Sequence, residues 1–349
     1  MLKSKKEFYK YTGDLSQIVG IKEYELTTGR AKGVRAFDIK NGSGLEFTLL
    51  GDRCLDISSL SFNGVNLSYL SKAAVSAPAY SESGMNFTRA FYAGFLTTCG
   101  LRNVGDACEE EGELFGLHGR VSTLPAEEVN ASVHWVDDVP ELTVSGKIRE
   151  ASFFGENLLL ERKVTCRYGE NSIHISNTVE NQGFKPEVLM LLLHFNVGYP
   201  LLSPSSRFVS PSERVIPRDG VAEKGMDDYA RMQPPTKNYE EQVFYHTLRE
   251  DSDQATAVAL INPELEVGVS LHFNKKEFPL FAQWKQMGEG EYVMGMEPTN
   301  CYVGGRHDAR NKDILTYIQP FEKERFDIEV KVHTGSDSLD KLENSISLY

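Results

Sequence analysis

Two histidines and one glutamate have sequence neighbours that suit proton-transfer chemistry. His118 lies in "FGLHGRVS", His194 lies inside the apolar run "EVLMLLLHFNVGYPLL", and Glu297 precedes Pro298 in "EYVMGMEPTN". An imidazole and a desolvated carboxyl group can give and take a proton near neutral pH. Each of the three also has a purely structural interpretation, and the residues around it bear on the choice.

His118 has a glycine on either side, Gly116 and Gly119, with Arg120 just beyond. Glycine lets the backbone take unusual dihedral angles and approach another group closely. A histidine that only fills the core rarely needs such freedom. The flanking glycines therefore favour a functional role for His118, with a structural histidine as the alternative.

His194 lies in a segment, residues 190–197, that reads as a strand buried on both faces. Because side chains alternate along a strand, His194 and Asn196 share one face, where they are the polar exceptions. Gly198 and Pro200 mark the nearby strand end, which is where a pocket can open. The alternative is a core histidine that is hydrogen-bonded to a backbone carbonyl.

Glu297 shares a strand face with Val293 and Gly295, and Pro298 should end the ladder just after it. A carboxyl group at the end of an apolar strand loses hydration unless it is paired. This loss raises its pKa towards the range that is useful for a general base. A surface glutamate at a strand end is equally compatible with the pattern.

Several further residues are candidates for binding a substrate: Arg53, Asp56, Arg102, Asn103, Asn196, Trp284 and Arg306. Arginine forks suit hydroxyls, carboxylates and phosphates alike. Arg53 has Asp52 and Asp56 beside it, so an internal ion pair is as compatible as a binding role. Arg102 is the stronger candidate because its irregular segment leads to His118. Trp284 is either an apolar platform for a ligand or a core side chain.

Composition excludes several classes of partner. The 349 residues carry a formal net charge of −13, which repels phosphates and anionic lipids, so we expect neither nucleic acid nor membrane partners. The five cysteines are odd in number and lack CxxC spacing, which indicates reduced thiols in a cytoplasmic protein. No signal-like or membrane-spanning run is found. No metal-ligand spacing or cofactor motif occurs, so we expect no metal and no cofactor.

Short runs of β-branched and aromatic residues, several with period-two alternation, dominate the chain, and helical patterns are rare. This spacing predicts an all-β fold, a large antiparallel β-sandwich or barrel with few short helices. A hairpin turn is expected at residues 169–171. A short helix is expected at residues 336–347, capped by Ser336 or Ser338.

Two long segments, residues 79–122 and 203–248, interrupt the strand pattern and are rich in Gly, Pro and charge. Long loops within a compact domain are commonly functional, and the aromatic and arginine content favours ordered loops that wall a site. Because no strong linker is found, we expect residues 1–20 to be an N-terminal arm and residues 21–349 to be a single domain.

Taken in order, five segments resemble one known family: "GDRCLDISSLSFNGVNLSYLS", "GFLTTCGLRNVG", "GLHGR", "LLHFNVGYPLL" and "MEPTN". The chain resembles the aldose 1-epimerase (galactose mutarotase-like) superfamily and, within it, the bacterial DUF4432 branch. The resemblance covers most of the chain, from about "GDLSQIVG" onward. It implies a β-supersandwich with a sugar-binding cleft on one face.

The resemblance also implies roles for individual residues. His118 would hydrogen-bond the sugar near its ring oxygen, His194 would protonate that oxygen, and Glu297 would take the proton of the anomeric hydroxyl. Arg102 resembles the substrate-binding arginine, and Asp56 is the candidate for the aspartate that grips sugar hydroxyls. The sequence departs from the family in lacking the "TNH" lead-in before the second histidine.

These roles imply an aldose 1-epimerase-like isomerase that interconverts the anomers of a small-molecule sugar, as a monomer or a homodimer. The alternatives are a non-catalytic carbohydrate-binding or sensing protein, and another sugar isomerase or lyase on the same fold. We expect the two histidines and Glu297 to converge on one cleft, with Glu297 and His194 on opposite sides of a sugar-sized space.

Overall fold

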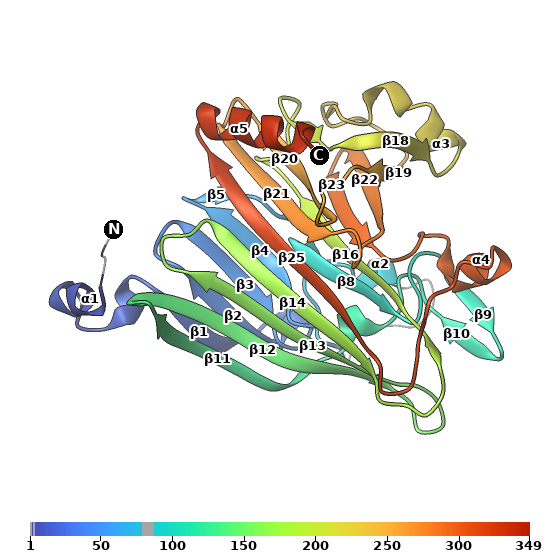
Figure 1. The fold of residues 1–349 in the computed structure, drawn as a ribbon, viewed down its shortest axis with the longest axis horizontal. Helices are drawn as coiled ribbons and strands as arrows, with labels where there is room; N and C mark the ends of the chain where they lie inside the picture. Colours follow the sequence, from blue (N-terminus) through green and yellow to red (C-terminus); the bar gives the residue numbers. More distant parts are fainter. Residues whose placement is uncertain (1, 3, 79–86) are drawn as a thin grey trace.

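The computed structural model describes residue 2 and residues 4–78 and 87–349, and antiparallel sheets dominate it (Figure 1). The largest sheet has eight strands in the order β11-β12-β13-β14-β25-β21-β20-β17. Their bounds are β11 Ala126–Val136, β12 Val139–Ala151, β13 Asn157–Arg167, β14 Ser172–Asn181, β25 Lys323–Thr334, β21 Val267–Asn274, β20 Ala255–Asn262 and β17 Arg207–Val209. The expected hairpin turn at residues 169–171 is confirmed, because it joins β13 to β14.

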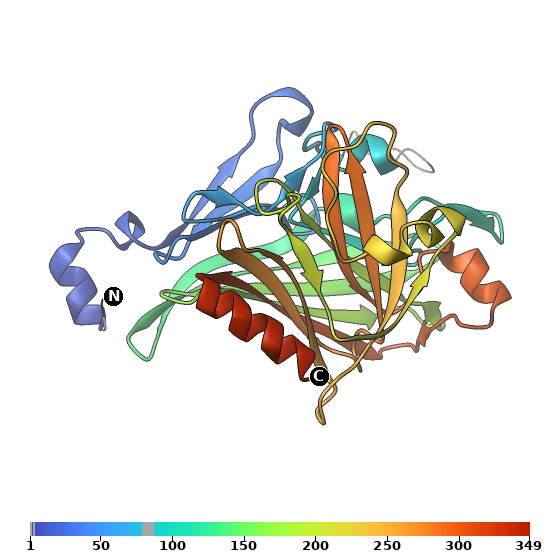
Figure 2. The ribbon, with the colours of Figure 1, turned by 90° about the horizontal axis from the view of Figure 1, so that it is seen from above.

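A second sheet of six strands packs against the first, in the order β18-β19-β22-β23-β16-β8. Its strands are β18 Ser212–Pro217, β19 Gln242–Leu248, β22 Leu280–Gly288, β23 Glu291–Thr299, β16 Met190–Val197 and β8 Leu96–Leu101. Figure 2 shows this sheet rising over the curved large sheet. The expected antiparallel sandwich with few short helices is thus confirmed.

The N-terminal part of the chain forms a third sheet of five strands in sequence order. These are β1 Gly20–Glu25, β2 Arg35–Lys40, β3 Leu45–Leu50, β4 Asp56–Phe62 and β5 Val65–Asn66. Three two-stranded pairs complete the β-structure: β6 Tyr69–Leu70 with β7 Ala93–Gly94, β9 Cys108–Glu110 with β10 Glu113–Phe115, and β15 Glu187–Val188 with β24 Tyr317–Ile318.

The α-helices are short: α1 Lys5–Tyr11, α2 Phe87–Ala90, α3 Gly220–Glu223, α4 Gly305–Asn311 and α5 Ser336–Ser347. Single 3-10 turns are Leu15–Gln17, Gly29–Ala31, Val121–Thr123 and Met226–Asp228. The C-terminal helix has the expected span, but its expected serine cap is wrong. Gly335 is the N-cap residue, with φ 85°, and no side chain caps the helix. Among the described residues, no helix is long and apolar enough to cross a membrane.

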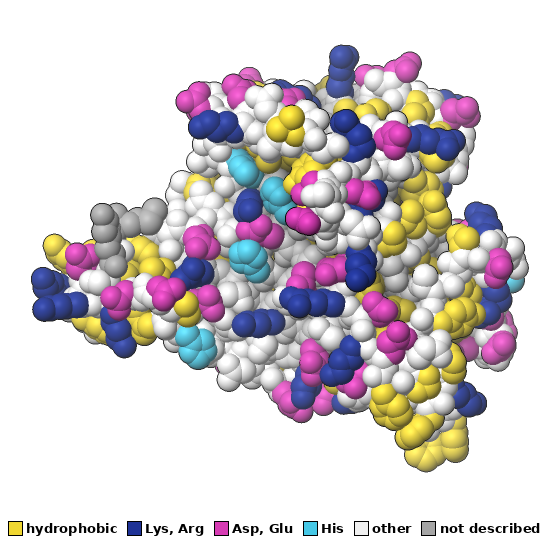
Figure 3. Space-filling model, in the orientation of Figure 1, with side chains coloured by type: hydrophobic (Ala, Val, Ile, Leu, Met, Phe, Trp, Pro, Cys, Tyr) yellow, Lys and Arg dark blue, Asp and Glu magenta, His cyan; other side chains and the backbone are white. Residues whose placement is uncertain are grey.

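The main core lies between the sheets, and β16 shows how the sequence builds it. Leu191, Leu193, Phe195 and Val197 belong to this core, whereas Met190 and Leu192 pack in a separate cluster on the other face. The expected alternation is confirmed. The outward face of the eight-stranded sheet carries intermixed charges of both signs (Figure 3), as expected for a sheet with one solvated face.

The two irregular segments contain more regular structure than expected. Residues 79–86 lie outside the described residues, but the remainder of the first segment includes β8, which pairs with β16. The second segment includes β17, β18 and β19. These strands form because they pair with neighbouring strands. Their glycine-rich or charged sequences have little strand propensity of their own, so local sequence does not predict them.

Candidate active site

A pocket of about 190 Å³ opens on the face of the six-stranded sheet that points away from the main core. Strands β16, β22 and β23 contribute one side of it, and the loops around His118, Phe91 and Arg218 contribute the rest. Its lining consists of Phe87, Thr88, Phe91, Gly105, Asp106, Leu117, His118, His194, Arg218, Glu241, Val243, Trp284, Glu297 and Val303. The structure therefore brings together His118, His194, Glu297 and Trp284 of the residues that the sequence singled out.

His194 and Glu297 are cross-strand neighbours. Antiparallel pairing of β16 with β23 sets Leu192 opposite Thr299 and Phe195 opposite Met296, and this register aligns His194 with Glu297. The result is a contact of 3.1 Å between His194 Nε2 and Glu297 Oε1. Directly opposed side chains on one sheet face are expected to interact in this way.

This contact corrects the expectation that the two groups face each other across a sugar-sized space. Both side chains are nearly sealed, with exposed fractions of 6% for His194 and 3% for Glu297. His194 Nδ1 has no hydrogen-bond partner within the described part of the chain, and Glu297 Oε1 has none beyond its contact with His194. Buried polar atoms are usually fully paired, so these unused hydrogen-bonding positions mark the pocket as a place for a ligand.

Burial shifts the pKa of each group in the direction that favours its neutral form. The pKa of Glu297 is raised to about 8, chiefly by burial and further by the nearby Glu241 carboxylate, while Arg218 opposes the rise. Burial lowers the pKa of His194 to about 3, and His118 contributes to that lowering. The pKa of His118 falls to about 4 through burial. These opposite shifts favour the proton of the pair on the Glu297 carboxyl group.

His118 reaches the pocket because its loop takes a left-handed conformation. His118 has φ 58° and Gly119 has φ 75°. A Cβ on Gly119 would lie 2.2 Å from the carbonyl oxygen of Gly100, so this position requires glycine. The Gly105 N–H donates to His118 Nδ1 at 3.3 Å. In the neutral ring this leaves Nε2 as the N–H donor.

Gly295 provides the space in which the pair meets. It lies on β23 two residues before Glu297, opposite Trp284 on β22. A Cβ at this position would lie 2.5 Å from Glu297 Oε1 and 3.2 Å from His194 Cε1. The absence of a side chain at Gly295 is thus a condition for the contact between the two catalytic candidates.

Aromatic rings and one ion pair complete the wall. The His194 ring packs edge-on against Trp284 and Phe91, with centroid distances of 5.3 and 5.5 Å. Trp284 Nε1 donates to Glu241 at 2.8 Å, and Arg218 Nη2 donates to the same carboxylate at 3.2 Å. This arrangement fixes the indole ring at the edge of the pocket.

Arg102 does not line the pocket, which corrects its expected role in binding a substrate. Its guanidinium contacts Glu113, Glu156 and Glu187 at 2.7, 3.2 and 3.3 Å and lies over the Phe115 ring. These carboxylates neutralise the cation, and Glu113 accepts hydrogen bonds from its Nη1. Arg102 therefore anchors the β9–β10 hairpin within an ion-pair network.

Arg306 and Asn103 belong to the same network, and the expectation that they bind a substrate is also corrected. Arg306 Nε donates to Glu110 at 2.7 Å, and its Nη1 donates to the Arg102 carbonyl. The Asn103 side chain accepts from the Arg306 backbone N–H and donates to the Gly116 carbonyl. Asn103 thereby supports the loop that carries His118 but does not line the pocket.

Arg53 and Asp56 are buried away from the pocket and do not pair with each other. Arg53 donates to the backbone carbonyls of Ser122, Ser76 and Ala90, so it ties loops together. Asp56 accepts from Arg162 at 2.6 Å and from Thr98, with both side chains of the ion pair fully buried. The expectation that Asp56 grips sugar hydroxyls is therefore corrected to a structural ion pair.

Asn196 shares the face of His194, as expected, but is fully buried. Its amide donates to the His194 carbonyl at 2.9 Å, and it does not line the pocket. Its place in the structure is to support the strand that carries His194.

Sequence reasoning missed Arg218 and Glu241, which line the pocket from the segment 203–248. That segment was expected to wall a site, but its charge-rich sequence gave no means of choosing among its many arginines and glutamates. Phe91 was also missed, although it lies in the irregular segment that leads to His118.

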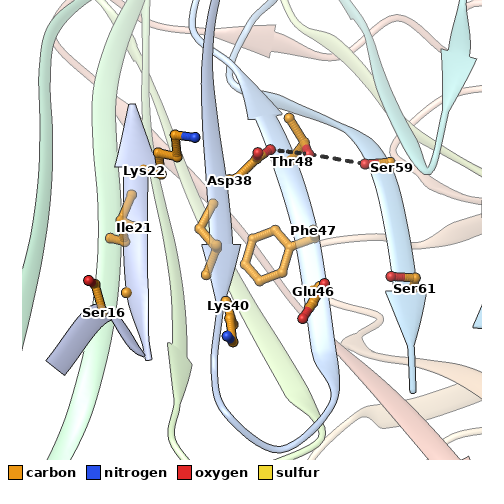
Figure 4. A pocket seen from close by; sticks show the side chains of 12 residues that line it. Ser16, Ile21, Lys22, Asp38, Lys40, Glu46, Phe47, Thr48, Ser59 and Ser61 are labelled. Carbon is orange, nitrogen blue, oxygen red and sulfur yellow. Dashed lines mark hydrogen bonds between the residues drawn. The ribbon is translucent and has the colours of Figure 1, made fainter. Parts of the chain in front are cut away.

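A larger hollow of about 600 Å³ lies on the N-terminal sheet. Figure 4 shows Asp38, Thr48 and Ser59 side by side on neighbouring strands, where Thr48 donates to Asp38 at 2.6 Å and Ser59 to Thr48 at 3.1 Å. This hollow contains none of the residues with candidate acid–base roles. Within the described ranges, no cluster of three or more His, Cys, Asp or Glu side chains is arranged to hold a metal ion.

Comparison with solved structures places this fold. A "putative aldose 1-epimerase" from Klebsiella pneumoniae is 24% identical, with a TM-score of 0.89 over 94% of this chain and 87% of that one. A galactose mutarotase-like protein from Clostridium acetobutylicum is 12% identical, with a TM-score of 0.67 over 91% and 100%. A galactose 1-epimerase from Lactobacillus acidophilus is 13% identical, with a TM-score of 0.57 over 91% and 99%.

At these identities the similarity shows a shared fold. A search among curated proteins finds no match. The profile of the family described as "Domain of unknown function (DUF4432)" matches residues 31–332, which is most of the chain. The chain therefore belongs to the DUF4432 family and has the galactose mutarotase-like fold.

Proposed function

We propose that the protein is an aldose 1-epimerase-like isomerase that interconverts the α and β anomers of a sugar, with His194 and Glu297 as the proton-transfer pair. The observation that carries the proposal is the buried contact of 3.1 Å between His194 Nε2 and Glu297 Oε1 in a pocket that also contains His118. A binding site alone has no need for a buried acid and base in contact.

The short contact fits the chemistry of anomerisation. The ring oxygen and the anomeric hydroxyl are both attached to C1, so the groups that serve them belong close together. In ring opening, Glu297 takes the hydroxyl proton and His194 gives a proton to the ring oxygen. The C1–O5 bond breaks as the C1 carbonyl forms. Rotation about C1–C2 and the reverse steps then give the other anomer.

The pKa shifts of the pair bear on how its proton is distributed during the reaction. Ring opening leaves Glu297 protonated and His194 neutral, and burial shifts both pKa values in the direction that favours this state. Binding of a closed ring then requires the proton to pass from Glu297 to His194. The direct contact provides the path, and the carboxylate gains the anomeric hydroxyl as a hydrogen-bond donor.

His118 supplies a fixed donor. Because Gly105 N–H occupies Nδ1, the Nε2–H is available to a sugar oxygen, and the lowered pKa keeps the ring neutral. A neutral donor positions the ring oxygen without competing for its proton. His118 is therefore assigned to binding and orientation, and His194 to proton transfer.

Trp284 and Phe91 supply the apolar part of the site. Their rings contact His194 and line the pocket, so they exclude water from the pair and maintain its shifted pKa values. The indole ring lines the pocket and suits the C–H face of a pyranose ring, while its N–H donates to Glu241. The volume of about 190 Å³ is below the range for drug-sized ligands and suits one ring.

The test is exchange NMR of the anomeric protons of a panel of neutral aldoses, with and without the protein. We expect at least one sugar to exchange anomers faster with the wild type than in buffer. We expect Glu297→Gln to lose about 10²–10⁴-fold in rate, the usual contribution of a general acid or base. A wild type that binds sugars but accelerates none would favour a carbohydrate-binding protein, and a new product signal would favour another isomerase or a lyase.

A further inference from the structure

A second cavity of about 840 Å³ borders the candidate active site. Four residues line both hollows: Asp106, Arg218, Glu241 and Val303. The smaller pocket holds the acid–base pair, and the larger cavity continues from its edge between the β18–β19 region and α4. A ligand whose first ring fills the pocket therefore has space for a further group beyond the Arg218–Glu241 ion pair.

The cations of this cavity are all engaged by carboxylates. Arg218 donates to Asp219 at 2.9 Å and to Glu241 at 3.2 Å, and Lys312 donates to Asp308 at 2.8 Å. Asp106 adds a further acidic side chain to the lining. Across the described lining of both hollows, the carboxylates thus outnumber the cations.

The four arginines that the sequence offers as phosphate ligands are engaged by other groups. Arg102 and Arg120 pair with Glu113, and Arg306 pairs with Glu110. Arg53 is committed to backbone carbonyls. The segment 79–86, which lies outside the described residues, contains neither lysine nor arginine. A phosphate or carboxylate on the substrate would therefore meet net negative charge, which disfavours binding.

The remaining lining of the cavity is apolar and aromatic. Tyr245 and Tyr302 pack edge to face with ring centroids 4.9 Å apart, and Tyr302 is 37% exposed. Ile216 and Ile314 also line the cavity and are partly exposed. A rigid ring with a hydroxyl at its edge offers an uncharged polyol both an apolar face and a hydrogen-bond partner.

We propose that the larger cavity is a second subsite for an uncharged sugar unit, so that the substrate is a neutral reducing disaccharide whose aldose end reacts at His194 and Glu297. This proposal rests on the proposed isomerase function and names its substrate class. It predicts a preference for two-unit neutral sugars over the corresponding monosaccharides, and discrimination against sugar phosphates.

The experiment compares kcat/KM for anomer exchange, by exchange NMR, among glucose, galactose, maltose, cellobiose, lactose and the two hexose 6-phosphates. We expect at least one disaccharide to exceed its monosaccharide about tenfold, and each 6-phosphate to fall at least tenfold below its parent sugar. Tyr302→Ala should lower the disaccharide-to-monosaccharide ratio about tenfold. Tyr11→Ala, which truncates an exposed tyrosine on α1, should leave that ratio unchanged.

A 6-phosphate that is the better substrate, or a ratio that Tyr302→Ala does not change, would overturn the proposal while leaving the isomerase function standing. If no sugar is accelerated at all, the isomerase function fails, and binding then tests the subsite separately. Saturation-transfer NMR should in that case still detect disaccharide binding that Tyr302→Ala weakens about tenfold. Binding that the substitution leaves unchanged would refute the second subsite.

Discussion

Replacement of Gly295 by alanine tests how closely activity depends on the contact between His194 and Glu297. The new Cβ would lie 2.5 Å from Glu297 Oε1, 3.0 Å from Trp284 Cβ and 3.2 Å from His194 Cε1. Ordinary contact begins near 3.4 Å, so the carboxyl oxygen has to move by about 1 Å. A displacement of about 1 Å from the productive geometry costs on the order of 10²-fold in rate.

The expected loss in kcat/KM corresponds to about 2.7 kcal/mol of transition-state stabilisation. Overpacking should also lower the free energy of unfolding by about 1–3 kcal/mol. The assay is exchange NMR on a sugar that the wild type anomerises, at a temperature well below the thermal midpoint of the variant. Thermal unfolding by circular dichroism measures the stability term separately.

Gly268→Ala is the matched control because it is also a strand glycine with a tight contact. Gly268 lies on β21 of the eight-stranded sheet, beneath α5. A Cβ at this position would lie 2.9 Å from the side chains of Ile261 and Leu339. We expect a similar loss of stability with little loss of rate. A folded Gly295→Ala protein with kcat/KM within about threefold of the wild type would refute the reasoning.

Three further predictions concern charge. Burial raises the pKa of Glu297 from 4.5 to about 8. Between these pH values the folded state keeps a proton that the unfolded state has released, so the free energy of unfolding falls as the pH rises. Urea unfolding at pH 5 and pH 7.5 should therefore show the free energy of unfolding of the wild type falling, relative to that of Glu297→Gln, by ~1.4 kcal/mol per pH unit. The same difference between the two proteins at both pH values would contradict this. Glu241→Gln should lower the pKa of Glu297 and move the corresponding limb of the pH–rate profile to lower pH, and a shift to higher pH would be inconsistent with the cited charge effect. Asp56→Asn should lower the free energy of unfolding by about 3–5 kcal/mol because it leaves the Arg162 charge unpaired in the core. Asp308→Asn, at the more exposed ion pair with Lys312, should lower it by about 1 kcal/mol or less. A stable Asp56→Asn protein with a raised KM would restore the sugar-binding role of Asp56.

Strand parity is why the sequence could assign His194 to one face of its strand. A period of two assigns every residue of β16 to one face or the other, and a histidine among apolar residues is then conspicuous. His118 was predictable for another local reason, since its flanking glycines match the left-handed conformation of the loop. Local sequence does not encode the register between β16 and β23, so the direct contact of the pair was not foreseen.

Local sequence does not reveal which groups the arginines contact. Arg102 and Arg306 lie far apart in the sequence, yet both guanidinium groups lie over Phe115 and pair with acidic residues from other segments. An arginine in a glycine-rich loop looks the same whether it faces a ligand or a glutamate. Arg218 and Glu241 line the pocket from a segment without periodicity, so only the tertiary structure could select them.

The most direct test of the central claim is to measure binding and anomer exchange together on Glu297→Gln and His194→Gln, with a sugar that the wild type accelerates. If the pair transfers protons, both variants should retain sugar affinity within about tenfold while the exchange rate falls by about 10²–10⁴-fold. Exchange that continues at the wild-type rate in either folded variant would contradict the claim that His194 and Glu297 are the acid and the base.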